Sequence, residues 1–160
     1  MKYLQIAEAK GLQKIVTVQN PYSLLNRSYE VGLAEIAYQE QVQLLAYSPL
    51  GFGVLSGKYL NNQRPDNARI TLYPNYDRYL SDNSVKATQA YADLAKENHL
   101  TPAQLALAFI NSRPFVAANI IGATTLEQLK ENIESIEITL SESVLQQIET
   151  IHSQYPIPAP

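Results

Sequence analysis

Apolar positions along the chain fall into short clusters that alternate between strand-like and helix-like spacing. Three short apolar runs predict strands, and the first of them, IVTV, is apolar enough for a strand buried on both faces. The predicted strands are 15–18, 42–47 and 118–121. The predicted helices are 1–10, a segment containing Leu33 and Ile36, 84–98, 102–112, a segment containing Leu129, Ile133 and Ile136, and a last helix after Ser141. This alternation predicts an α/β fold with a parallel sheet covered by helices.

Local signals mark where several of these helices begin and end. Gly11 follows the first helix as a natural C-terminal stop. The segment Thr101–Gln104 combines an N-cap hydroxyl, a proline at the first helical position and a glutamine three residues after the cap. Pro114 ends that helix. Ser141 is predicted to cap the last helix, whose inward-facing residues are Val144, Leu145, Ile148 and Ile151.

Residues 48–82 form the longest segment without a predicted element, and they are rich in Pro, Gly and Asn. Loops of this length in a small domain usually bind a ligand or lack order. We therefore expect 48–82 to be a long ligand-binding loop.

Composition narrows the possible functions. The chain has 12 Lys and Arg against 15 Asp and Glu, a formal net charge of −3 and no basic cluster, so neither nucleic acid nor an anionic membrane surface is an expected partner. It has no cysteine, which excludes a disulfide framework and a thiolate nucleophile and fits the reducing cytoplasm. No stretch is long and apolar enough for a membrane span or a secretion signal. The length of 160 residues suits one domain but falls short of the about 250 residues of a complete (β/α)₈ barrel.

The most informative candidate site follows the second predicted strand, since ligands of parallel α/β folds bind at the carboxyl ends of strands. In Tyr47–Lys58, three glycines let the backbone approach a ligand, Lys58 supplies a positive charge, and Tyr47 offers a ring for stacking. These features suit a nucleotide cofactor. The same residues equally fit a glycine-shaped turn with a solvated lysine. The segment is not a Walker loop, because Tyr59 stands where Ser or Thr would follow the lysine.

A second candidate site follows the third predicted strand. Gly122–Gln128 places the backbone N–H groups of a helix N-terminus and two hydroxyls at a strand end, an arrangement that attracts phosphate. Thr125 and Gln128 also form an ordinary capping box, which from the residues alone is the favoured interpretation. The polar residues Gln128, Glu131 and Asn132 share one helix face.

No catalytic residue and no metal ligand can be predicted. The histidines, His99 and His152, are far apart and lack a carboxylate at a useful spacing. None of the tyrosines has a convincing Lys or His partner to lower its pKa.

Five ordered segments resemble the C-terminal part of an aldo-keto reductase, and they are most similar to the Tas-type bacterial branch of that family. The segments are QNPYSLLNRSYE (19–30), YSPLGFGVLSGKY (47–59), TPAQLALAF (101–109), IIGATTLEQLKENIES (120–135) and the terminal YPIPAP. The resemblance implies a (β/α)₈ barrel that binds NADP(H) across the carboxyl ends of its strands and transfers hydride to an aldehyde or ketone.

The same resemblance assigns cofactor contacts to particular residues. Gln19 would bind the nicotinamide carboxamide, and Tyr47 would stack on the nicotinamide ring. The pyrophosphate would be lined by Ser48, Leu50, Gly53 and Lys58, with Arg69 assisting. Gly122, Thr124 and Gln128 would hold the adenosine 2′-phosphate region, and Glu131 with Asn132 the adenine. Many relatives carry a basic residue near the Gly122 turn, and its absence here leaves the preference for NADP over NAD open.

The family's catalytic tetrad of Asp, Tyr, Lys and His comes from the first half of the barrel, and no segment here matches it. We therefore expect residues 1–160 to be a single partial domain, the last three βα units of a (β/α)₈ barrel, and truncated relative to the complete enzyme. Such a chain would bind cofactor but would be inactive alone.

The alternative is a non-catalytic regulatory or structural fragment that binds a nicotinamide cofactor, because potassium-channel beta subunits share a similar YSPL-to-GKY loop. A piece with three strands would also have two open edges, which predicts self-association.

Overall fold

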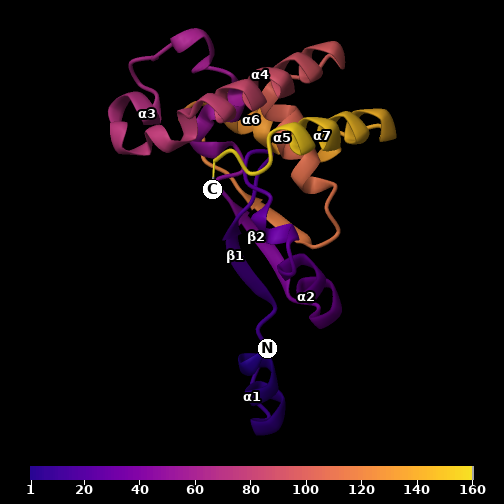
Figure 1. Cartoon of the computed structure of the whole chain (residues 1–160). Helices are drawn as coiled ribbons and strands as arrows, with labels where there is room; N and C mark the ends of the chain where they lie inside the picture. The colour runs from indigo at the N-terminus through magenta and orange to yellow at the C-terminus, as the bar shows by residue number, and fades with distance from the viewer. Residues whose placement is uncertain (160) are drawn as a thin grey trace.

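The computed structural model describes residues 1–159 and shows an α/β chain with one parallel sheet (Figure 1). The strands are β1 (Thr17–Pro21), β2 (Gln43–Tyr47) and β3 (Val116–Ile120). The α-helices are α1 (Lys2–Lys10), α2 (Leu33–Glu40), α3 (Arg69–Leu72), α4 (Asp82–Glu97), α5 (Pro102–Asn111), α6 (Leu126–Glu134) and α7 (Glu142–Gln154). Short 3₁₀ segments lie at Ser28–Glu30 (η1), Gly51–Ser56 (η2), Leu60–Asn62 (η3), Pro74–Leu80 (η4) and Ser135–Glu137 (η5).

The sheet has the order β1-β2-β3, and both pairings are parallel, as the sequence predicts. Tyr47 at the end of β2 pairs with Pro21 on one side and with Ile120 on the other. All three strands therefore end at the same edge of the sheet. The loops that follow them, which carry the candidate site, begin from one place.

Strand β1 differs from its prediction in two ways. It begins at Thr17 and ends at Pro21, whereas the predicted range is 15–18. The expectation that this run is buried on both faces is wrong, because Ile15 is 38% exposed and Val16 is 65% exposed. The physical reason is that β1 has one neighbouring strand among residues 1–159, so its outer edge and part of its surface lack a cover. Strand β3 is likewise displaced by two residues at its start from the predicted 118–121.

Helix signals in the sequence are confirmed where a side chain caps the helix. The Thr101 side chain accepts from the backbone N–H of Gln104, and the Gln104 side chain accepts from the N–H of Thr101, which completes the capping box of α5. Ser141 caps α7 in the same way by accepting from the N–H of Val144. Gly11 ends α1 in the left-handed conformation at φ 63°.

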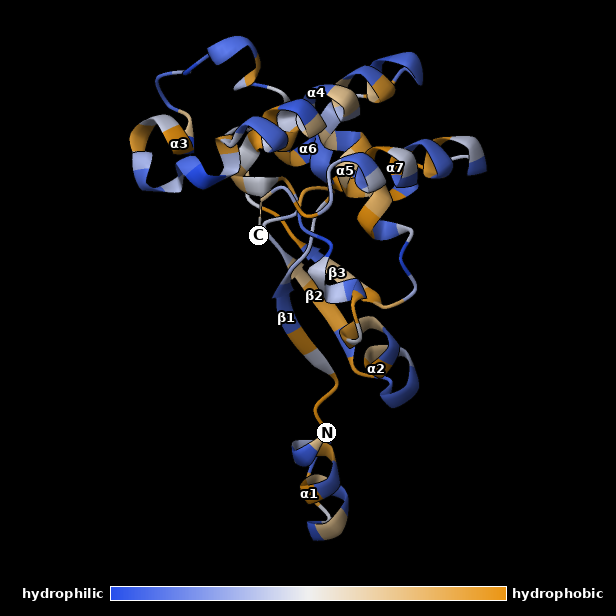
Figure 2. Cartoon of the chain, viewed as in Figure 1, coloured by the Kyte–Doolittle hydropathy of each residue, from blue (hydrophilic) through white to orange (hydrophobic). Residues whose placement is uncertain are grey.

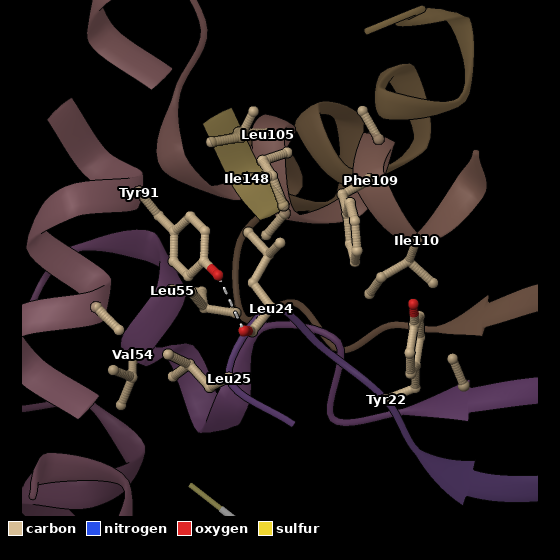
Figure 3. Close-up of a cluster of buried hydrophobic side chains, with 14 of the residues drawn as sticks. Tyr22, Leu24, Leu25, Val54, Leu55, Tyr91, Leu105, Phe109, Ile110 and Ile148 are labelled. Atoms are coloured by element: carbon tan, nitrogen blue, oxygen red, sulfur yellow. Dashed lines mark hydrogen bonds between the residues drawn. The ribbon is translucent and has the colours of Figure 1, made fainter. Parts of the chain in front are cut away.

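The hydrophobic core lies between the carboxyl edge of the sheet and helices α4, α5 and α7 (Figure 3). Tyr22, just after β1, stacks on Phe109 of α5 with ring centroids 6.2 Å apart. The Tyr91 hydroxyl of α4 donates to the carbonyl of Leu24. The segment after β1 is therefore fixed from two helices at once. Figure 1 shows α1 at the opposite end of the sheet from these helices.

Figure 2 shows apolar residues (orange) along the sheet and the segments beside it, and several of them are exposed. On the β1 flank, Val16 and Leu33 of α2 are exposed. On the β3 flank, Leu129 and Ile133 of the predicted stripe lie on α6, whereas Ile136 lies beyond the helix in η5, and the three residues are 39–64% exposed. The helical period predicted these helices, but it does not state whether a partner covers their apolar faces.

Candidate functional site

Gln19 and Tyr47 share one face of the sheet at its carboxyl edge. In the parallel register Gln19 pairs with Leu45, and Tyr47 lies two residues beyond Leu45 on the same face. Both Gln19 and Tyr47 are exposed. The opposite face carries Leu44 and Ala46, which are fully buried under the helices. The strand pattern therefore directs the two predicted nicotinamide contacts to the open face.

The turn after Tyr47 has several residues in the left-handed region. Ser48 has φ 54°, and the consecutive residues Phe52 and Gly53 have φ 57° and 89°. A non-glycine residue in this conformation costs about 1 kcal/mol, so surrounding contacts must hold it there. Val54 and Leu55, 2% and 1% exposed, insert into the core and anchor the turn (Figure 3).

The end of the Lys58 side chain packs against Gly53. A Cβ built on Gly53 would lie 2.7 Å from Cε of Lys58 and 2.9 Å from its Nζ, so only glycine leaves this space for the lysine. The Ser56 hydroxyl donates to the carbonyl of Gly53 at 2.8 Å and tightens the same turn. The structure thus brings the predicted residues Gly53 and Lys58 into direct contact.

Arg69 joins this turn through the ring of Phe52. Its guanidinium carbon lies 5.1 Å from the Phe52 centroid, within the range of a cation–π interaction. The Tyr59 hydroxyl accepts from the N–H of Ile70 at 3.1 Å, so the residues that follow Lys58 and Arg69 are also joined. The 48–82 segment is not free of structure, because it forms the short elements η2, η3, α3, which begins at Arg69, and η4.

The electrostatics of this turn favour an anion. Burial lowers the pKa of Lys58, because desolvation disfavours the charged amine. Within residues 1–159 no carboxylate lies within 4 Å of Lys58 or Arg69, since the ion pairs found there involve other residues. Two cations held near one glycine turn without a carboxylate partner form a site that a phosphate group would stabilise.

The Gly122 turn forms the second part of the candidate site. The Gln128 side-chain oxygen accepts from both the N–H and the hydroxyl of Thr124, at 3.0 and 3.1 Å, and the Thr125 hydroxyl caps α6. Within the described part of the chain, the amides of Gly122 and Ala123 have no acceptor. The predicted capping box is incomplete: Thr125 accepts from the N–H of Gln128, but the Gln128 side chain accepts from Thr124 and not from the N–H of Thr125. The unpaired amides lie beside this cap.

Acidic charge also lies at this helix start. The pKa of the Glu127 carboxyl is lowered, mainly by a hydrogen bond from its own backbone N–H and also by one from Thr125. Glu127 therefore places a negative charge in the first turn of α6, at the helix end where an anion would bind. The space around Gly122 itself is open, because a Cβ added there would meet no atom within 4 Å.

Glu131 and Asn132 are engaged elsewhere in the fold. The Thr101 hydroxyl donates to the Glu131 carboxylate, so this predicted adenine contact connects α6 to the start of α5. Asn132 is 6% exposed and lines a groove of about 260 Å³ between α5, β3 and α6. Of the predicted adenosine contacts, Thr124 and Gln128 lie together, whereas Glu131 and Asn132 make separate contacts.

Sequence reasoning missed two groups of residues near the site. One is the ring cluster around Phe52, which has no sequence period that could reveal it. The other is Arg27, 5% exposed, whose guanidinium donates twice to Glu30 at 2.7 and 2.8 Å. The spacing of Arg27 and Glu30 by three residues was the available signal for this pair. The Tyr22 hydroxyl also donates to Glu30, and the three residues fix the loop that follows Gln19.

Two classes of site have little support in the described residues. In residues 1–159 no group of three or more His, Asp or Glu side chains is placed to hold a metal ion. No helix within that range combines the length and the apolar character needed to cross a membrane.

A model of the Aldo/keto reductase family matches residues 1–153, which include both candidate turns. The chain belongs to the aldo/keto reductase family. The resemblance stated from the sequence motifs, including its Tas-type branch, is confirmed.

Individual aldo/keto reductase relatives agree with this assignment. "Protein tas" of Escherichia coli (strain K12) is 56% identical over 160 residues, which is 100% of this chain and 46% of that protein. "Uncharacterized oxidoreductase YrpG" of Bacillus subtilis (strain 168) is 33% identical over 91% of this chain and 43% of that protein. "Probable voltage-gated potassium channel subunit beta" of Arabidopsis thaliana is 31% identical over 95% of this chain and 50% of that protein. The chain spans about half the length of the curated relatives it matches.

Proposed function

We propose that this chain is the cofactor-binding part of an NAD(P)H-dependent carbonyl reductase and forms the last three βα units of a (β/α)₈ barrel. Membership of the aldo/keto reductase family supports the reaction class. The parallel sheet supports the barrel position, because it leaves β1 and β3 each with one neighbour in residues 1–159 and with apolar flanks.

The observation that carries the proposal is the pair of cations at the Gly53 turn. Lys58 lies against Gly53, Arg69 lies on the neighbouring Phe52 ring, and neither has a carboxylate partner in the described chain. A pyrophosphate supplies the two negative charges that such a site lacks. The residues present therefore fit a dinucleotide.

The other predicted contacts concern the remaining parts of the dinucleotide. Gln19 and Tyr47, exposed on one face at the carboxyl edge, would hold the nicotinamide as hydrogen-bond partner and stacking ring. Ser48 and Leu50 would line the pyrophosphate beside Lys58. The unpaired amides at Gly122 and the side chains of Thr124 and Gln128 would receive the adenosine end, with Glu131 and Asn132 near the adenine.

When bound, the nicotinamide supplies the hydride that reduces a carbonyl. The residues of this chain bind the dinucleotide, orient its ring through Tyr47 and neutralise its phosphates through Lys58 and Arg69. We propose that the proton donor and much of the pocket for the small carbonyl substrate lie outside this sequence. The chain alone would then bind cofactor without turnover. A reducing compartment, and so the cytoplasm, suits a chain without cysteine.

Titration of the purified chain with NADPH and with NADH, followed by nicotinamide fluorescence, tests this proposal. Binding should be saturable, and Lys58→Ala should weaken it about tenfold, since a charge-assisted contact contributes about 1.5 kcal/mol or more. Lys86→Ala removes an exposed lysine of α4 and is the matched control. The proposal fails if the wild-type chain does not bind, or if both variants bind like the wild type. Comparison of the two cofactors decides the preference for NADP or NAD.

A regulatory fragment that senses the cofactor is the second candidate, and the similarity to a protein named as a potassium channel subunit beta favours it. It predicts the same cofactor binding but also predicts no carbonyl reduction when the relatives' other half is supplied. The open strand edges support a further proposal, that this chain self-associates through β1 and β3.

A further inference from the structure

Phe52 has a backbone conformation that its own residue type disfavours. It is the middle one of three consecutive residues with positive φ in the turn after Leu50, with φ 57°, and the other two, Gly51 and Gly53, are glycines. A glycine would adopt that conformation without a steric penalty. The ring must therefore make contacts that hold the residue in place.

Those contacts come from the distal half of the 48–82 segment. The Phe52 ring stacks on Tyr76 at 4.5 Å between centroids and lies 4.9 Å from Tyr79, while Arg69 lies on it at 5.1 Å. We name these four residues, Phe52, Arg69, Tyr76 and Tyr79, the Phe52 cluster. Tyr79 is 5% exposed and also packs near Gly51, so the cluster is anchored in the body of the protein.

Two positive charges contact adjacent residues of this turn, one of them through the Phe52 cluster. Lys58 lies against Gly53, and Arg69 lies on the ring of the residue before it. Arg69 is exposed and has no ion-pair partner in residues 1–159, so without the ring its side chain would turn to solvent. The ring therefore determines whether the second cation stays at this turn.

We propose that Phe52 is a positioning residue of the cofactor site, which holds Arg69 at the same turn that Lys58 contacts and closes the distal half of the 48–82 segment onto that turn. This inference rests on the proposed function for its ligand. Its structural half, closure of the segment, does not depend on any ligand.

The first test measures closure of the free chain. Trypsin cuts after Arg69 and Arg78, both in the segment, and Phe52→Leu should speed these cleavages about fivefold while the thermal midpoint stays near that of the wild type. Phe52→Tyr keeps the ring, so trypsin should cleave this variant at the wild-type rate. Tyr73→Leu removes an exposed ring of the same segment and is the matched control. Equal cleavage rates in Phe52→Leu, Tyr73→Leu and the wild type would overturn the closure.

The second test measures coupling to Arg69. Phe52→Leu and Arg69→Ala should each weaken NADPH binding about tenfold, and the double variant should bind no more weakly than either single variant, because both changes remove the same contact. Phe52→Gly should bind NADPH as weakly as Phe52→Leu, although glycine relieves the backbone strain. This variant separates the effect of losing the ring from the effect of the backbone conformation. Additive losses would overturn the positioning role. A wild-type chain that does not bind NADPH contradicts the proposed function and the cofactor half of this inference, while the cleavage rates still decide the closure.

Discussion

Arg27 and Glu149 form an ion pair of 2.9 Å that joins the loop after β1 to the helix α7. Arg27 is 5% exposed, and the same guanidinium binds both carboxylate oxygens of Glu30. One buried cation thus connects two acidic residues from distant parts of the sequence. It holds the loop next to Gln19 against the body of the protein.

Replacing Arg27 with methionine should destabilise the chain by about 3 kcal/mol, because it leaves the half-buried Glu30 carboxylate without its partner. Glu149→Gln should cost about 1 kcal/mol or less, since Glu149 is 47% exposed and water screens its pair. Urea denaturation measures both values. Similar losses in the two variants would contradict the buried position of the Arg27–Glu30 pair.

Acid stability should depend on Glu30. Burial would raise the pKa of this carboxyl, but hydrogen bonds from Arg27 and Tyr22 and the charge of Arg27 outweigh it, so the pKa is lowered from its usual 4.5. The stability that Glu30 contributes is therefore complete above about pH 4.5 and is lost as the pH falls through its lower folded pKa.

Urea midpoints measured from pH 6 to pH 3 should fall less steeply in Glu30→Gln than in the wild type. Glu8→Gln, at an exposed position of α1, should keep the wild-type slope. An unchanged slope in Glu30→Gln would show that other carboxylates carry the acid dependence.

Gly53→Ala should reduce both stability and cofactor binding. The new methyl group would lie 2.7 Å from Lys58 Cε, and the residue would keep φ 89°, which L side chains rarely adopt. We expect a loss of about 1 kcal/mol in unfolding free energy and about tenfold weaker NADPH binding as Lys58 is displaced. Gly122→Ala is the control for stability alone, because its Cβ would meet no atom within 4 Å. Binding within about twofold of the wild type in Gly53→Ala would contradict the role of Lys58.

Self-association through the open edges should weaken when a charge is placed on β1. Val18 is 36% exposed in this edge strand, and a lysine there would oppose pairing with another strand. Sedimentation velocity over a range of concentrations should show fewer oligomers for Val18→Lys than for the wild type. Tyr73→Lys, outside the sheet, should leave the distribution unchanged. A wild-type chain that stays monomeric at every concentration would contradict the proposal.

Local chemistry explains which parts of the fold the sequence predicted. The Thr101–Gln104 capping box could be predicted because its hydrogen bonds lie within four residues. The start of β1 could not, because the apolar run at 15–18 and the strand pairing with β2 overlap only at Thr17 and Val18, and pairing depends on a distant segment. The exposure of Ile133 could not be predicted either. Its helical spacing is a local pattern, but its burial depends on whether a distant segment packs over it.

The candidate site likewise has features set by neighbouring residues, which the sequence can predict, and features set by distant contacts, which it cannot. The glycine-rich turn and its lysine, Lys58, could be recognised as a candidate in the sequence because they lie within a few residues, whereas the roles of Gly53 and Lys58 at a pyrophosphate came from the family resemblance. The approach of Arg69 to Phe52 depends on how a long irregular segment folds back, and no periodic pattern describes that path. The engagement of Glu131 by Thr101 is likewise a contact between separate helices.

The backbone N–H of Ala159 donates to the carbonyl of Leu25, and Ala159 is fully buried. Together with Arg27–Glu149, this contact ties an early loop to residues that the ribosome adds much later. While translation is in progress, the strands β1 and β2 can already pair, but the loop beside Gln19 lacks this support until Ala159 has emerged. A chain stalled shortly before Ala159 would therefore retain the sheet and lose the order of its nicotinamide end.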